Sequence, residues 1–112
     1  MAIDQLNVVD FAATNPTLNQ VVLVISDHLE WTDDDESNKL HMYLLQQKVN
    51  AYLEFVESGE IYRSYPKAVG KSIVISVVAK FPMNNKAATF FEKVRSIVLK
   101  LGYDIEFDNP RD

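Results

Sequence analysis

The chain has 112 residues, which suits one domain and is too short for two. Hydrophobic residues make up 47% of it and charged residues 24%, as in ordinary globular proteins, so global disorder is not expected. There is no cysteine, which excludes disulfides and thiolate metal sites. No apolar stretch approaches the roughly 18 residues that indicate a membrane span. Residues 1–4 lack the basic start of a secretory signal, so we expect a cytoplasmic protein.

The net charge of −5 is distributed unevenly. Residues 1–38 contain eight acids and no Lys or Arg, whereas residues 39–112 contain all 11 bases and the other eight acids, so the two parts carry −8 and +3. Within residues 61–101, eight bases accompany the single acid Glu92. Such asymmetry can steer a charged partner or orient self-association, unless the fold interleaves the two signs on one surface.

Two short apolar runs predict a β-hairpin near the start of the chain. Val8–Ala13 and Val21–Ile25 flank the segment Asn15-Pro16-Thr17, whose Pro fixes φ and whose Asn favours turn geometry. The second run is continuously apolar and rich in β-branched residues. This is typical of a strand buried at the centre of a sheet.

A long helix is predicted from about Ser37 to Ser58. The four acids of Asp33–Glu36 precede it, and carboxylates at a helix start interact favourably with the helix dipole and can cap free amides. Apolar residues recur at helical spacing on one face: Leu45, Val49, Tyr52, Leu53 and Val56. Gly59 is the expected C-terminal cap, and Glu60–Gly70 is predicted to be a loop.

The second half of the chain predicts a strand, a helix and a strand. Ser72–Phe81 alternates regularly, with one face made of Ile73, Ile75, Val77, Ala79 and Phe81. A helix capped by Asn84 or Asn85 then runs to Gly102 with an apolar stripe: Ala87, Phe90, Phe91, Val94, Ile97, Val98 and Leu101. In residues 103–108, apolar and acidic residues alternate, which indicates a half-exposed strand near a sheet edge.

The order β-β-α-β-α-β predicts a single α+β domain over residues 1–112. Each helix has one apolar stripe, so the simplest arrangement is a two-layer sandwich with both helices on one face of a four-stranded mixed sheet. The second helix permits a parallel, right-handed βαβ connection. Val74 and Val78 would then lie on the other face. Either a homodimer buries that face, or the N-terminal segment or a loop covers it.

Three segments carry a family resemblance: Ser26-Asp27-His28-Leu29-Glu30-Trp31, the helical run Tyr43–Leu53, and the stretch from Glu57-Ser58-Gly59-Glu60 through Tyr65-Pro66. Over about residues 7–108 the chain resembles a family of small bacterial proteins classed as a domain of unknown function. The resemblance implies a bacterial, stand-alone domain. It implies no reaction, cofactor or catalytic residue.

The strongest catalytic candidates are Asp27 and His28. They follow the predicted central strand, where functional residues often lie, and a His beside a carboxylate can act as a general base. Ser26 is the only evident nucleophile nearby, and its side chain should point away from that of its neighbour. In the alternative interpretation, Asp27 binds backbone amides, His28 is exposed and Trp31 packs under the first helix.

The acidic run before the first helix is a candidate metal site. Asp33, Asp34, Asp35, Glu36 and His41 offer oxygen and imidazole ligands. The run lacks the alternating spacing and turn glycine of a calcium loop, and His41 has no second His four residues on. We therefore predict no metal and no cofactor, and interpret the carboxylates as a solvated helix start.

Aromatic and basic residues alternate in the predicted loop after the first helix. Tyr62, Arg63, Tyr65 and Lys67 form a pattern that occurs where bases stack and phosphates pair. On the second helix, Lys86, Lys93 and Lys100 recur every seven residues, roughly on one face. The acidic net charge argues against nucleic acid as the partner. These tyrosines can equally pack on the helices.

These observations favour a non-catalytic protein-interaction module, homodimeric or resembling an inhibitor or immunity protein. The candidate contacts with a partner are Trp31, Tyr62, Arg63, Tyr65 and Lys67. The alternatives are a small enzyme that uses Asp27 and His28, and an anion-binding or nucleic-acid-binding domain.

Overall fold

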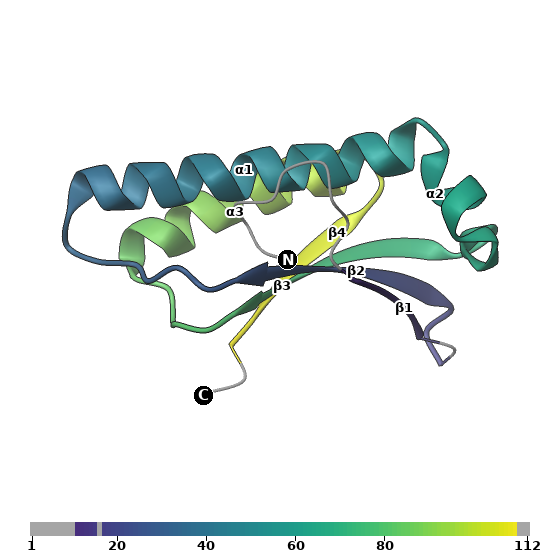
Figure 1. The fold of residues 1–112 in the computed structure, drawn as a ribbon, viewed down its shortest axis with the longest axis horizontal. Coiled ribbons are helices and arrows are strands. Elements are labelled where there is room, and N and C mark those ends of the chain that lie inside the picture. The colour runs from purple at the N-terminus through teal and green to yellow at the C-terminus, as the bar shows by residue number, and fades with distance from the viewer. Residues whose placement is uncertain (1–10, 16, 110–112) are drawn as a thin grey trace.

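Figure 1 shows the computed structural model, which describes residues 11–15 and 17–109, and the side chains from Thr14 on. Its elements are β1 (Phe11–Asn15), β2 (Gln20–Asp27), α1 (Asp35–Glu57), α2 (Glu60–Ser64), the 3-10 turn η1 (Pro66–Ala68), β3 (Ser72–Ala79), α3 (Asn85–Lys100) and β4 (Asp104–Asp108). The predicted α+β class and the order β-β-α-β-α-β are confirmed.

The four strands form one mixed sheet in the order β1-β2-β3-β4. β1 and β2 are antiparallel, as the predicted hairpin requires, whereas β2, β3 and β4 are parallel. Each parallel connection contains a long helix, and crossovers of one hand place their helices on the same face of a sheet. Figure 1 shows α1 and α3 side by side above the sheet. The predicted edge position of the last strand is confirmed.

The core lies between the sheet and these two helices. Along β2, residues Val21, Leu23, Ile25 and Asp27 are buried, and the residues between them are more exposed, because successive side chains of a strand alternate between faces. Ile73, Ile75, Val77 and Ala79 form the equivalent face of β3 and are buried, as predicted. From the helices, Leu45, Val49, Phe91 and Val98 are buried against this layer.

Both long helices begin at a capping side chain. The Asp34 carboxylate accepts a hydrogen bond from the Ser37 amide at 3.1 Å, and Asn84 Oδ1 accepts one from the Ala87 amide at 2.8 Å. These bonds satisfy amides that have no partner within the helix. The caps set where α1 and α3 begin, and both starts lie at the same end of the molecule (Figure 1).

The structure corrects two features of the sequence prediction. The segment predicted as a loop, Glu60–Gly70, contains α2 and η1, and these turns are held by the fully buried side chains of Ile61 and Ala68. Ile97 on α3 and Leu101 directly after it belong to the predicted apolar stripe but are 57% and 47% exposed. The apolar stripe therefore includes more residues than the side of the helix that contacts the sheet. The Val8–Asp10 part of the first predicted strand lies outside the described residues.

The opposite face of the sheet is covered by no helix that the structure describes (Figure 1). On this face Val22 and Val78 are half-buried, and Val74 is buried. Within the described ranges, none of the helices is long and apolar enough to cross a membrane. A cytoplasmic location stays a prediction.

Candidate functional site

A buried carboxylate stands at the end of β2. Asp27 is only 2% exposed, because it continues the inward-facing row of the strand. Its Oδ1 accepts a hydrogen bond from the Leu29 amide at 3.1 Å, which turns the chain after the strand. Burial of a charged group is costly unless that group is paired, so the stability of this arrangement depends on the other contacts of the carboxylate.

The partner of Asp27 is His41 on α1. His41 Nε2 lies 2.8 Å from Asp27 Oδ1 and 2.6 Å from Oδ2, and the imidazole is 2% exposed. His28, which the sequence placed beside Asp27, is exposed to solvent. The structure therefore brings a different histidine, from 14 residues further along the chain, to the predicted carboxylate.

Trp31 completes this cluster by stacking on His41. The two ring centroids are 3.6 Å apart and the ring planes meet at 16°. Trp31 thus packs beneath the first helix, which was the structural alternative for this residue. The indole Nε1 and the imidazole Nδ1 are buried and have no hydrogen-bond partner among the residues that the structure describes.

A carboxylate that orients an imidazole is also found in hydrolases, where the second ring nitrogen acts as the general base. Here the ring is covered by Trp31 and almost completely excluded from solvent. Ser26, the hydroxyl nearest in sequence, is on the opposite side of β2, where it is exposed. Asp27, His41 and Trp31 are arranged to hold the loop after β2 against α1.

A second polar cluster joins the loops that precede α1 and α3. Asn38 Nδ2 and Asn84 Nδ2 both donate to the Thr32 carbonyl, at 2.7 and 3.0 Å, and the Thr32 amide donates to Asn38 Oδ1 at 3.0 Å. The two helix starts are therefore fixed to one loop. A polar hollow of about 220 Å³ lies here, lined by Thr32, Asp33, Asn38, Asn84, Asn85 and Lys86.

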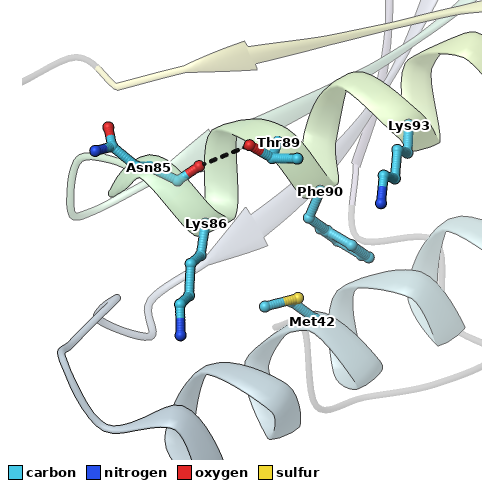
Figure 2. A pocket seen from close by; sticks show the side chains of 6 residues that line it. All are labelled: Met42, Asn85, Lys86, Thr89, Phe90 and Lys93. Atoms are coloured by element: carbon cyan, nitrogen blue, oxygen red, sulfur yellow. Dashed lines mark hydrogen bonds between the residues drawn. The ribbon is translucent and has the colours of Figure 1, made fainter.

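A larger, mostly apolar groove of about 400 Å³ lies between α1 and α3. Its lining residues are Met42, Asn85, Lys86, Thr89, Phe90 and Lys93. Figure 2 shows Phe90 pointing from α3 towards Met42 on α1, with the Lys86 and Lys93 side chains extending towards α1 on either side of Phe90. This volume is within the range of ordinary binding pockets, which are mainly apolar with a few polar groups.

The acidic run takes on separate structural roles. Asp34 caps α1, and the Asp35 carboxylate pairs with Lys86 of α3. The hydrogen bond and the charge of Lys86 lower the pKa of Asp35, and Lys39 adds to the effect. In the part of the chain that the structure describes, no group of three or more His, Asp or Glu residues could hold a metal ion.

The other predicted contact residues lie away from both clusters. Tyr62, Arg63 and Lys67 are exposed on α2 and η1, which follow the end of α1, whereas Trp31 precedes its start. Figure 1 shows α2 at the opposite end of α1 from that start. Tyr65 is half-buried, and its hydroxyl lies 2.7 Å from Thr14 Oγ1 on β1. The structure thus does not bring Trp31 together with the aromatic and basic residues of this segment.

Sequence reasoning missed His41 as the partner of Asp27 and Met42 as part of a groove. One signal for His41 was available, because it lies four residues before Leu45 on the buried face of α1, together with Asn38 and Lys48. Lys86 and Lys93 were recognised as a repeating basic pair. Their position beside Phe90 depends on how α3 packs on α1.

Comparison with known proteins gives a family but no described activity. Neither the curated proteins nor the solved structures include a match to the chain. A family model of unknown function, DUF6572, matches residues 1–111, which is nearly the whole sequence. The chain therefore belongs to the DUF6572 family of unknown function.

Proposed function

We propose that this protein is a non-catalytic protein-interaction module that binds its partner through the outer surface of its two long helices. The observation that carries the proposal is the exposure of large apolar side chains there. Leu40 and Tyr43 on α1 are 59% and 57% exposed, and Ile97 on α3 is 57% exposed. Leu40 and Tyr43 are three residues apart on α1 and so lie next to each other, and large apolar groups gathered on an exposed surface mark interaction sites more often than scattered single residues do.

The burial of Asp27 and His41 supports a binding role over the enzyme alternative. The imidazole is held by the carboxylate and covered by Trp31, so a substrate would have to displace a packed indole to reach it. This pair therefore contributes to stability in our proposal. A general base must come within hydrogen-bond reach of the substrate proton that it removes, and the covered imidazole of His41 does not offer that access.

Capture experiments with matched surface variants test the proposal. The tagged wild-type chain is compared with Leu40→Ser/Tyr43→Ser, in lysate of the organism that encodes it. The control is Leu18→Ser/Val69→Ser, which removes two side chains that are 61% and 65% exposed outside α1 and α3. We expect the same proteins with the wild type and the control, and their loss with the helix variant. Equal capture by all three chains contradicts the proposal.

Self-association through the helix-free sheet face is a separate part of the proposal. It is supported by the register of β2 and β3, which places Val22 beside Val74 and Ser26 beside Val78. These valines are less exposed than the apolar groups on the helices, so the helical surface is favoured for the partner. Sedimentation equilibrium of the wild type and of Val22→Glu measures the molecular mass in solution. We expect a dimer for the wild type and a monomer for the variant, and a wild-type mass equal to the monomer at every concentration excludes the homodimer.

A further inference from the structure

We infer that the groove between α1 and α3 binds an acidic amphipathic helix of the partner protein, an inference that rests on the proposed function and specifies its ligand. A bound helix would insert one large apolar side chain between Met42 and Phe90. Its carboxylates would pair with Lys86 and Lys93. Such binding, with an apolar helix face in an apolar groove, is a common mode of peptide recognition.

The groove has the chemistry that this ligand requires. Met42 and Phe90 are half-buried from opposite helices and form its apolar floor. Lys86, Phe90 and Lys93 are spaced four and three residues apart, so they share one side of α3. The two lysines flank the apolar floor, as Figure 2 shows. An apolar side chain with an acidic group one turn away on either side would match this arrangement.

Charge complementarity identifies the partner segment as acidic. Lys93 is exposed and forms no ion pair with the residues that the structure describes. Lys86 contacts Asp35, and Lys39 is close enough to lower the pKa of that carboxyl. The groove lining that the structure describes thus contains two cations, Lys86 and Lys93, and no carboxylate, in a chain whose net charge is −5. Positive groups beside an apolar floor favour an acidic ligand over a basic one.

α3 lines the groove from Asn85 to Lys93 and continues beyond it to Lys100. α3 has 16 residues, which corresponds to about 24 Å at 1.5 Å per residue. Beyond the floor, α3 exposes Ile97, three residues before Lys100. The apolar and basic character therefore continues along the same helix. A partner segment of about four turns would cover this length.

A peptide selection tests the inference directly. The probe is a display library of random 16-residue peptides, selected against the full-length wild-type chain. We expect the enriched peptides to have large apolar residues at helical spacing, with Asp or Glu between them, and to bind more weakly as salt increases. Failure to enrich any peptide, or enrichment of basic or uncharged sequences, overturns the inference.

Charge variants then locate the binding site by fluorescence anisotropy with one enriched peptide. Lys86→Ala/Lys93→Ala should weaken binding about tenfold. The control Arg63→Ala/Lys67→Ala removes the same net charge at α2 and η1, and it should leave the affinity within about twofold. Asp35→Asn should strengthen binding several-fold, because it frees Lys86 for the peptide. Equal weakening by the two double variants, or no gain from Asp35→Asn, contradicts the assignment.

The two proposals can fail separately. If capture from lysate depends on Leu40 and Tyr43 while the selection yields no acidic peptide, the interaction function stands and the acidic-helix ligand is wrong. If capture gives the same proteins from every variant, the proposed function itself fails.

Discussion

Asp27 shows how a single buried charge determines the local structure after a central strand. The carboxylate is removed from water, so it depends on the Leu29 amide and on His41 for compensation. Both contacts bring later parts of the chain back to the end of β2. The cost of an uncompensated buried charge makes this arrangement sensitive to the loss of either partner.

His41→Ala should lower the free energy of unfolding by about 3 kcal/mol, because Asp27 would stay buried without its imidazole and Trp31 would lose its stacking partner. The matched control His28→Ala removes an exposed ring and should change stability by less than about 0.5 kcal/mol. Urea unfolding monitored by circular dichroism measures both. Similar losses in the two variants would contradict the structural role of the buried pair.

The sequence predicts the place of this cluster and two of its members, Asp27 and Trp31, but not the third, His41. Asp27 was recognised because it follows a run of buried β-branched residues. The sequence indicates His28 as the partner of Asp27 only because the two residues are adjacent, although neighbouring side chains at a strand end point to opposite sides. His41 belongs to a different element, and its contact with Asp27 depends on how α1 crosses β2.

The starts of α1 and α3 are coupled through one loop. The Asn84 side chain caps α3 with its oxygen and also donates a hydrogen bond from its nitrogen to the Thr32 carbonyl. Among the described residues, the Asp34 side chain makes only the capping hydrogen bond of α1. A residue that both caps a helix and holds a loop should contribute more to stability than a cap alone.

Asn84→Ala should therefore lower the free energy of unfolding by about 2 kcal/mol, and Asp34→Ala by about 1 kcal/mol. Asn85→Ala, an exposed substitution within the first turn of α3, should change it by less than about 0.5 kcal/mol. Denaturant midpoints of the three variants give the comparison. A smaller loss for Asn84→Ala than for Asp34→Ala would show that the bond to Thr32 adds nothing.

A pH-dependent contact joins α3 to β4. Arg95 donates to the Asp104 carboxylate at 3.1 Å, and this hydrogen bond lowers the pKa of Asp104 below its usual value of 3.8. A lowered pKa in the folded state stabilises the protein above pH 3.8, and this contribution is lost as the pH falls through the folded-state pKa. Both side chains are over 40% exposed, so screening by water keeps the effect small.

Asp104→Asn should consequently reduce stability slightly at pH 7, and the difference from the wild type should vanish under strongly acidic conditions. Urea unfolding at a series of pH values below 7 measures this. A difference that is constant across the series would mean that the charge of Asp104 is not its cause.

Regular periodicity accounts for the elements that could be predicted. The alternation in Ser72–Phe81 and the helical stripe of α1 reflect the packing of one face, so they were visible without coordinates. The short α2 was missed, because a five-residue helix has too few residues to show a period. The exposure of Ile97 was also invisible, since the stripe alone does not give the width of the contact with the sheet.

The molecule as a whole has one covered sheet face and one outer helical surface. The opposite charges of its two halves meet where Asp35 pairs with Lys86, so the fold interleaves the two signs at that point. Lys93 extends from α3 into the neighbouring groove, whose described lining residues include basic but no acidic side chains. Neither feature could be predicted from the sequence, because both depend on α1 and α3 lying side by side.

Backbone amide chemical shifts of the ¹⁵N-labelled chain, with and without the partner recovered by capture, test the central claim of binding through the helical surface most directly. We predict that the largest changes lie in residues 39–47 of α1 and residues 86–100 of α3. Changes concentrated in β2 and β4, or in Tyr62–Lys67, would contradict that claim.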